Sequence, residues 1–282
     1  MNTIIVHVQH SALKAYIQYF IFFNHKSHEQ FSYQTFPNTN LCLTIYKDNK
    51  IEYKRNRNEN HCTIAISQNK FSSRLYGFHK LPFKVDIKDT LDQICILFHP
   101  SGLRAFTKVP YVELLNESEV FECIFGDQKF MLERLFEQND PRKRSDLLEA
   151  FLLERLKPTN IDHKIQLALD YIYKTEGNIL VHELSRLLKI NESTQYRSFK
   201  EVLGQSPKDF IQTVRFRNAL KLLLERKFRN FTELSYQAMF YDQAHFIKDF
   251  KRRSGMLPNA FYQDVLLEQQ CLAWVIERSK PI

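Results

Sequence analysis

The stretches FKEVLGQSPKDF at residues 199–210 and FKRRSGMLPNAF at residues 250–261 place the same residue types at the same offsets. Phe-Lys, Gly, Pro and Phe recur after 51 residues, and Glu-Leu-Ser precedes each copy, at 183–185 and 233–235. Glycine accepts the left-handed conformation in which many helices end, and proline cannot continue a helix. The repeat therefore predicts two copies of one helical unit, each ending at its Gly and Pro.

Two short helices precede the repeated glycine in each copy. In the first copy, leucines form one face of residues 179–188, and Asn191 is suited to cap a second helix. In the second copy the helices are expected at 231–238 and 243–254, with Asp242 as the cap. Two short helices joined by a turn of three or four residues are typical of a helix-turn-helix.

A long unbroken segment, residues 209–227, connects the two units and is expected to be one helix. At about 1.5 Å per residue it would span roughly 25 Å. Successive major-groove faces on one side of B-DNA are about 34 Å apart. A rigid spacer of this size predicts two recognition helices over adjacent major-groove segments of the same duplex.

The exposed faces of the two second helices carry the candidate DNA contacts. They are Ser193, Thr194, Tyr196, Arg197 and Lys200 in the first unit, and Gln243, His245, Lys248 and Lys251 in the second. Arg, Gln, Ser and Thr can reach base edges in a major groove, whereas Lys suits phosphates. Any one of these residues alone is better interpreted as part of a solvated helix face. The duplicated scaffold and the spacer favour double-stranded DNA for the set.

The charge of the chain supports this interpretation. The net charge is +8, and residues 160–262 contain 17 Lys and Arg against 11 Asp and Glu. A basic half beside a nearly neutral half suggests a polyanion partner for one domain only, although a solubilising surface is the alternative. With 44% hydrophobic and 26% charged residues, the 282-residue chain has the composition of two globular domains rather than of a disordered protein.

The cysteines and the apolar runs indicate the compartment. The five cysteines are widely spread, without a C-x-x-C pair or Cys/His ligand spacing, so reduced thiols in a reducing compartment are expected rather than disulfides or zinc. Lys14 interrupts the apolar residues near the N-terminus, which form neither a signal peptide nor a membrane span. The sequence predicts a cytoplasmic protein without a membrane partner.

In the N-terminal part, the spacing of apolar residues is first typical of strands and then of helices. Residues 40–109 contain short β-branched and aromatic runs separated by polar stretches such as KDNK at 47–50 and NRNENH at 56–61, which predict turns. Residues 110–156 have helical periodicity, and Asn139-Asp140-Pro141 divides them. These residues predict a β-rich barrel or sandwich-like domain with trailing helices.

The complete chain is therefore predicted to be α+β. Three segments are expected: a domain over 1–157, a helical domain over 160–264, and an amphipathic helix over 265–282 that carries the only tryptophan. The boundary is expected near Pro158, which stops a helix.

The C-terminal third resembles the DNA-binding domain of the AraC/XylS transcriptional regulators. The resemblance is closest over LSYQAMFYDQAHFIKDFKRRSGMLPNAF at 234–261, and RFRNALKLLL at 215–224 is similar to the linker helix of that family. More weakly, LPFKVDI, FHPSGLRAF and LLEAFLLERL resemble an N-terminal domain of one branch of these regulators. The resemblance implies two helix-turn-helix units joined by a long helix, with a sensory or dimerising domain over residues 1–157. It also implies an activator or repressor of transcription.

The resemblance also implies site residues and departures from the family pattern. The base-reading positions would fall on Ser193, Tyr196 and Arg197 in the first unit, and on Gln243, Ala244, His245 and Lys248 in the second. The turn of each unit usually holds glycine, where this chain has Lys189 and Met239. Gln195 replaces an apolar residue that normally packs the first recognition helix, so the first unit is expected to be the weaker DNA reader.

Other functions leave weaker signals in this sequence. A nucleophile elbow, a P-loop and a G-x-G-x-x-G motif are all absent, so no catalytic residue, metal or cofactor is predicted. An N-terminal enzyme or a cupin-like metal site that uses His61, His79 or His99, attached to a DNA-binding domain, stays open as the alternative, as does an RNA-binding protein. Tyr46, Tyr53, Phe83 and Phe98 are expected to line a cavity for a small apolar or sugar-like effector, and a homodimer is compatible with the family.

Overall fold

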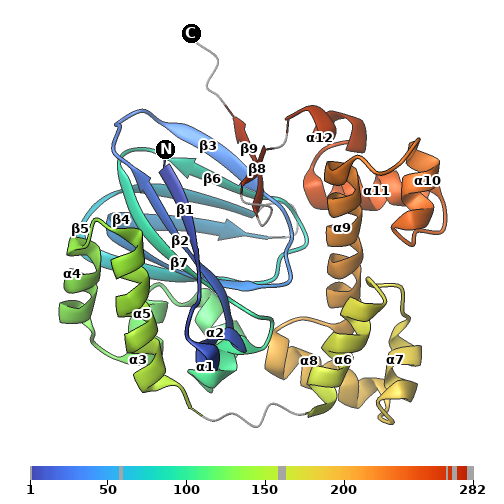
Figure 1. The fold of residues 1–282 in the computed structure, drawn as a ribbon, viewed down its shortest axis with the longest axis horizontal. Helices are drawn as coiled ribbons and strands as arrows, with labels where there is room; N and C mark the ends of the chain where they lie inside the picture. The colour runs from blue at the N-terminus through green and yellow to red at the C-terminus, as the bar shows by residue number, and fades with distance from the viewer. Residues whose placement is uncertain (1, 57–59, 158–162, 265, 269–271, 278–282) are drawn as a thin grey trace.

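The computed structural model describes residues 2–56, 60–157, 163–264, 266–268 and 272–277. A curled β-sheet with helices packed on it forms one part, and a helical domain lies beside it (Figure 1). The predicted α+β class and the two-part organisation are therefore confirmed. Residues 158–162, which contain most of the predicted boundary, lie outside the described residues.

The sheet is built almost entirely from the N-terminal part. Its strands are ordered β1-β2-β7-β4-β5-β6-β3-β9-β8, and every neighbouring pair is antiparallel except β5 with β6. The N-terminal strands are β1 Asn2–His7, β2 Ile17–His25, β3 Phe31–Thr35, β4 Leu41–Arg55, β5 Asn60–Tyr76, β6 Phe83–Ile87 and β7 Leu91–Phe98. The short helix α1, Ser11–Lys14, precedes β2.

The predicted turn at residues 47–50 is wrong. Strand β4 continues through it, and the pairing with β5 shifts register between Lys47 and Asn49. Asp48 has a φ of 56°, a conformation that Asp adopts more readily than most residues. The side chain of Asn49 is buried and donates to the Thr90 carbonyl oxygen at 3.0 Å. The polar residues thus form a β-bulge inside one long strand instead of a turn between two.

Helices cover one face of the sheet. They are the 3₁₀ helix Gly102–Ala105 and the α-helices α2 Tyr111–Asn116, α3 Val120–Phe125, α4 Lys129–Glu137 and α5 Pro141–Arg155. Their apolar side chains join Phe20, Ile45 and Ile96 in the largest hydrophobic core. Buried Arg144 of α5 forms a bidentate ion pair with Asp92 of β7, at 2.7 and 2.9 Å, which fixes this layer on the sheet.

The helical domain consists of α6 His163–Lys174, α7 Val181–Leu187, α8 Glu192–Leu203, α9 Pro207–Glu225, α10 Phe231–Gln237, α11 Gln243–Ser254 and α12 Pro258–Asp264. Two separate hydrophobic cores hold it together. One surrounds Phe199 and Phe210, and the other surrounds Phe250 and Phe261. The repeated sequence thus corresponds to two structural units, joined by the 19-residue helix α9.

The predicted C-terminal amphipathic helix is wrong. Residues Leu266–Glu268 form β8 and Leu272–Glu277 form β9, and β9 pairs antiparallel with β3 at the open edge of the sheet. Residues 265, 269–271 and 278–282 lie outside the described part of the chain. A short apolar run does not distinguish helix from strand by its periodicity. The edge of β3, which local sequence does not reveal, provides backbone partners for a strand.

Candidate nucleic-acid interface

Both recognition helices are capped in the same way. Asn191 Oδ1 accepts from the Thr194 N–H at 2.7 Å at the start of α8, and Asp242 Oδ1 accepts from the His245 N–H at 2.7 Å at the start of α11. Each helix ends at a glycine in the left-handed conformation, Gly204 with φ 73° and Gly255 with φ 75°. The predicted caps and ends are therefore confirmed.

The turn of each unit contains a non-glycine residue in the left-handed conformation. Lys189 has a φ of 52° and Met239 a φ of 58°. These are the two positions at which a glycine was expected from the family pattern. Each costs about 1 kcal/mol relative to glycine, an amount that the surrounding helices offset.

The repeated residues are scaffold. Phe199 and Phe250 are completely buried, and each contacts the second phenylalanine of its own copy, Phe210 at a ring distance of 6.3 Å and Phe261 at 5.2 Å. Equivalent ring contacts in both copies explain why the repeat is retained in the sequence. They fix the recognition helix against the following helix in each unit.

Most of the predicted DNA contacts lie on exposed surface. The exposed ones are Ser193, Thr194, Tyr196, Arg197 and Lys200 on α8, and Ala244, His245, Lys248 and Lys251 on α11. Gln243 is half-buried, and its Oε1 accepts from the Thr232 hydroxyl at 2.6 Å, so part of its hydrogen-bonding capacity is used within the domain. Lys200 Nζ lies 5.8 Å from the ring centre of Tyr196, one turn earlier. That these side chains contact DNA stays a prediction.

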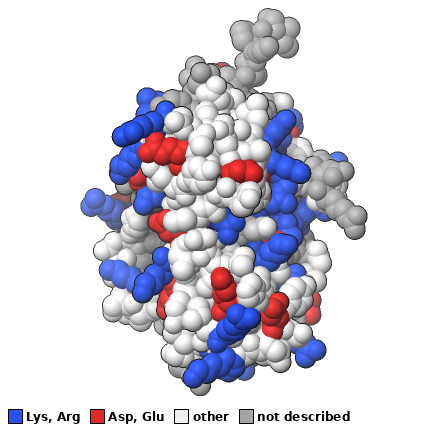
Figure 2. Space-filling model, turned by 90° about the vertical axis from the view of Figure 1, so that its right-hand side faces the viewer, with Lys and Arg blue, Asp and Glu red and all other residues white. Residues whose placement is uncertain are grey.

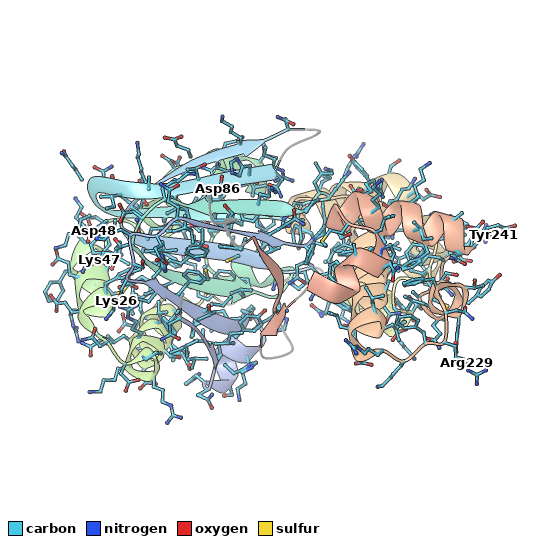
Figure 3. All side chains as sticks on the ribbon, turned by 90° about the horizontal axis from the view of Figure 1, so that it is seen from above. Lys26, Lys47, Asp48, Asp86, Arg229 and Tyr241 are labelled. Atoms are coloured by element: carbon cyan, nitrogen blue, oxygen red, sulfur yellow. The ribbon has the colours of Figure 1, made fainter. Side chains whose placement is uncertain are left out.

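Two exposed residues near the second unit were not found from the sequence. Tyr241, just before the cap of α11, is 86% exposed, and it lies with Arg229 at the end of the molecule farthest from the sheet (Figure 3). From sequence alone, an aromatic residue before a helix cap is readily assigned to the hydrophobic core. Its exposure to solvent becomes visible only in the folded structure. On this side of the helical domain, Lys and Arg lie along both margins of a largely uncharged band, with Asp and Glu among them (Figure 2).

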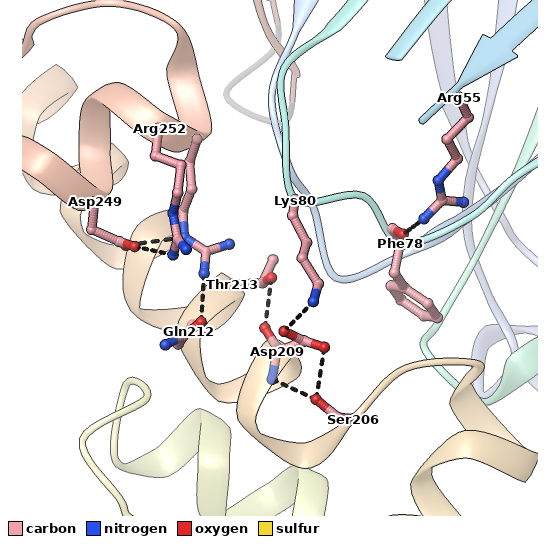
Figure 4. Close-up of polar contacts among 10 residues, drawn as sticks. Arg55, Phe78, Lys80, Ser206, Asp209, Gln212, Thr213, Asp249 and Arg252 are labelled. Carbon is pink, nitrogen blue, oxygen red and sulfur yellow. Dashed lines mark hydrogen bonds and ion pairs between the residues drawn. The ribbon is translucent and has the colours of Figure 1, made fainter. Parts of the chain in front are cut away.

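A buried arginine ties the second recognition helix to the linker. Arg253 is 1% exposed, and its guanidinium donates to Asp249 Oδ2 at 2.9 Å and to Gln212 Oε1 at 3.0 Å (Figure 4). Arg252 pairs with the other oxygen of Asp249. Arg253 therefore holds α11 against α9 and is not available to DNA, although its position at the end of a recognition helix would suggest a phosphate contact.

The two units differ most at one core position. Gln195 in α8 is completely buried, and neither its Oε1 nor its Nε2 has a hydrogen-bond partner within the described structure. The residue 51 positions later is Phe246, also completely buried, in an aromatic cluster with Phe240 and Phe250. An unsatisfied buried amide costs about 1–3 kcal/mol. The first unit is therefore packed less stably at this position than the second, and weaker DNA reading by the first unit stays a prediction.

The sheet part contacts the helical domain close to both recognition helices. Lys80 Nζ lies 2.8 Å from Asp209 Oδ1 at the start of α9 (Figure 4). Gln34 Nε2 donates to the Ser254 carbonyl oxygen at the end of α11 at 2.8 Å. Although burial alone would raise the pKa of Asp209, hydrogen bonds from Lys80 and Ser206 hold it below its ordinary value. Phe36 is buried in the core of the second unit, with its ring 4.8 Å from that of Phe261.

The repeated glycines lie in this contact. A Cβ atom on Gly204 would lie 3.1 Å from Tyr111 Cβ, and one on Gly255 would lie 3.3 Å from Pro82 Cγ. The sheet part therefore reaches the C-terminal end of both recognition helices.

A cavity of about 130 Å³ lies inside the sheet part. Tyr46 and Phe83 line it, as predicted, and Arg217 of α9 lines it from the helical domain. Two of the predicted lining residues are wrong. Phe98 belongs to the core on the opposite face of the sheet, and Tyr53 packs behind the cavity wall, with its ring 5.9 Å from that of Phe83.

The three histidines considered as metal ligands each contact a different partner. His61 pairs with Asp86 at 2.8 Å, His79 contacts the Gly77 carbonyl oxygen at 3.1 Å, and His99 lies 3.5 Å from Gln18 Nε2. Within the part of the chain that the structure describes, no three His, Cys, Asp or Glu side chains gather as a metal site. No helix in that part is long and apolar enough to cross a bilayer.

Comparisons with known proteins agree with this geometry. A helix-turn-helix domain matches residues 184–264, and a domain of unknown function (DUF6597) matches residues 7–119. The Msm operon regulatory protein of Streptococcus mutans is 28% identical over 122 residues, 42% of this chain and 44% of that protein. The chain spans less than half the length of the curated relatives that it matches.

Two solved structures are partly similar to this chain. ToxT from Vibrio cholerae is 12% identical, with 86% of this chain and 97% of that chain covered and a TM-score of 0.45. A probable AraC family transcriptional regulator from Rhodopseudomonas palustris is 23% identical, with 36% of this chain and 96% of that chain covered and a TM-score of 0.33. The helix-turn-helix match over residues 184–264 agrees with the two such units that α9 joins, so this part of the chain is a helix-turn-helix domain of the AraC type.

Proposed function

We propose that this protein regulates transcription by binding double-stranded DNA at specific sequences, with one recognition helix in each of two adjacent major-groove segments. One observation carries the proposal: two equivalent capped helices, α8 and α11, expose polar faces from opposite ends of the single rigid helix α9. At about 1.5 Å per residue, the 19 residues of α9 span about 28 Å, close to the separation of successive major-groove faces.

Different contacts are proposed for different positions. Lys200 and Lys251 occupy equivalent places in the last turn of each recognition helix and suit phosphates. Arg197 and Lys248, one turn earlier and also equivalent, suit base edges together with Ser193, Ala244 and His245. Thr194, Tyr196 and Gln243 complete the surface, and Tyr241 adds a hydroxyl donor for a phosphate near the start of α11.

We further propose that the sheet domain modulates DNA binding in response to a small-molecule effector. The cavity and the contacts of Phe36, Lys80 and Gln34 with the helical domain support this role. A cytoplasmic location and a homodimer belong to the same proposal. Sedimentation of the purified protein with and without DNA tests the dimer.

Selection of duplexes from random sequence by the full-length protein tests the DNA-binding proposal. We expect enrichment of two short motifs about one helical turn apart, and a binding constant that falls steeply with salt as phosphate contacts release counterions. Absence of duplex binding at low salt, or a preference for single strands, would overturn the proposal.

A further inference from the structure

The cavity of the sheet domain is matched in size to a small ring. Its volume is about 130 Å³, and the aromatic side chains of Phe23, Tyr33, Phe36, Tyr46 and Phe83 form much of its wall. An apolar protein cavity of about 150 Å³ accommodates benzene. The available space therefore accommodates a molecule of about one six-membered ring.

One hydrogen-bond acceptor in the wall has no donor. Gln93 of β7 is 6% exposed, and its Nε2 donates to Cys95 Sγ at 3.2 Å. Its Oε1 is buried and receives no hydrogen bond from any described residue. A buried amide oxygen without a donor is costly, so this atom points to a partner that the protein itself does not supply.

His79 provides a second acceptor of the same kind. Its Nδ1 lies 3.1 Å from the Gly77 carbonyl oxygen, an arrangement that requires the hydrogen on Nδ1. The other ring nitrogen, Nε2, then carries a lone pair, is buried and has no partner among the residues described. Both His79 and Gln93 line the cavity, so the two side chains that carry an acceptor without a donor belong to the same wall.

The chemistry of the ligand follows from this count. Two acceptors suit one or two hydroxyl or amino groups on an otherwise apolar ring. A sugar has more donors than these two acceptors can receive, so its other hydroxyl groups would depend on further polar lining residues such as Thr35, Asn38 and Asn40. An anion would need a cation, and Arg217, the one charged side chain among the described residues of the lining, already has an interaction of its own.

We propose that this cavity binds a small uncharged ring compound of the phenol class, in which one hydroxyl group donates a hydrogen bond to Gln93 Oε1 or His79 Nε2 and a second hydroxyl group, as in resorcinol, donates to the other acceptor. The inference rests on the proposed sensory role of the sheet domain and names the class of its effector. The size of the cavity selects for a single ring. The two acceptors distinguish a phenol, which can donate a hydrogen bond, from an apolar ring of the same size, which cannot.

Calorimetric titration of the full-length protein tests the proposal, with phenol and resorcinol as ligands and toluene, benzoate and glucose as comparisons. We expect phenol or resorcinol to bind at least tenfold more tightly than toluene, and neither benzoate nor glucose to compete. Gln93→Leu should weaken phenol binding about tenfold and leave toluene binding unchanged or stronger. The comparison of phenol with toluene in the natural protein does not depend on the folding of the variant.

Three results would overturn the inference. The first is that benzoate binds more tightly than any other ligand tested. The second is that phenol and toluene bind with equal affinity, and the third is that none of the ring compounds binds. DNA binding without ligand is measured separately, so a failure of the ligand experiment leaves the proposed DNA-binding function intact. A protein that binds phenol and no duplex would instead refute the proposed function.

Discussion

At the scale of single residues, Gln195 is the clearest imperfection of the helical domain. Gln195→Leu removes a buried amide that lacks partners and keeps a similar volume, so we expect the free energy of unfolding to rise by about 1–2 kcal/mol. Phe246→Gln places the same amide at the equivalent position of the second unit and should cost about 3–5 kcal/mol. Denaturant unfolding of the three proteins measures both changes. Destabilisation by Gln195→Leu would mean that the amide has a structural role.

His79 predicts a pH dependence of stability. Burial, the largest cause, together with Arg55, lowers the pKa of His79 from its ordinary 6.5 to about 4, against a smaller opposing effect of the Gly77 carbonyl. The unfolded chain therefore takes up this proton first, and stability is lost as the pH falls from about 6.5 to about 4. At about 1.4 kcal/mol per pKa unit, the loss is about 3 kcal/mol.

The variant His79→Asn isolates this effect from other titrating groups. Its amide can still donate to the Gly77 carbonyl oxygen, whereas it does not titrate in this range. Unfolding free energies of both proteins between pH 4 and 7 should differ most in slope below pH 6.5. Parallel curves would contradict the assignment.

At the scale of elements, the two recognition helices should contribute unequally to DNA affinity. Helix α8 is held by a core with an unsatisfied amide, and α11 by an aromatic cluster and by Arg253. A base-edge contact is worth about 1–3 kcal/mol, and we expect Lys248→Ala to lie near the top of this range and Arg197→Ala near the bottom. Fluorescence anisotropy titrations on a selected duplex measure both. Lys143→Ala, on the exposed side of α5, is the control for loss of a positive charge.

A helix or strand could be predicted from the sequence where the residues that determine it are its neighbours in the chain. The caps Asn191 and Asp242 and the glycine ends act on neighbouring residues, so the sequence located both recognition helices. The strand β9 depends on an edge 240 residues away in the chain, and its sequence alone favoured a helix. The cavity lining could be predicted only in part. Gln93 and Cys95 of β7 line the cavity, and side chains alternate between the two faces of a strand. Counting from Gln93 by twos would therefore have placed Phe98 on the opposite face of the sheet.

At the scale of the whole molecule, the two domains share side chains across their boundary. Phe36 lines the cavity of the sheet domain and is also part of the core of the second helix-turn-helix unit. Arg217 belongs to the linker helix and lines the same cavity. A ligand in the cavity would therefore contact residues that also position α11 and α9. This arrangement gives an effector a direct mechanical route to the DNA-reading helices.

Phe36→Ala tests whether the domains fold as one unit. We expect scanning calorimetry to show one transition for the natural protein, because Phe36 and the strand β9 join the two parts. Truncation of a buried Phe lowers the free energy of unfolding by about 3–5 kcal/mol. Because Phe36 packs in the core of the second helix-turn-helix unit, that unit should lose this stability. The variant should therefore show two transitions, the earlier from the helical domain.

Two exposed positions provide the controls for this experiment. Tyr241→Ala should leave the melting profile unchanged, because that side chain is 86% exposed. Lys80→Ala should lower stability by less than about 1 kcal/mol, since the Lys80 side chain is 64% exposed and its pair with Asp209 is screened by solvent. If Phe36→Ala lowers a single transition without dividing it, Phe36 contributes stability alone. The coupling of the cavity to α11 must then pass through Arg217 and α9.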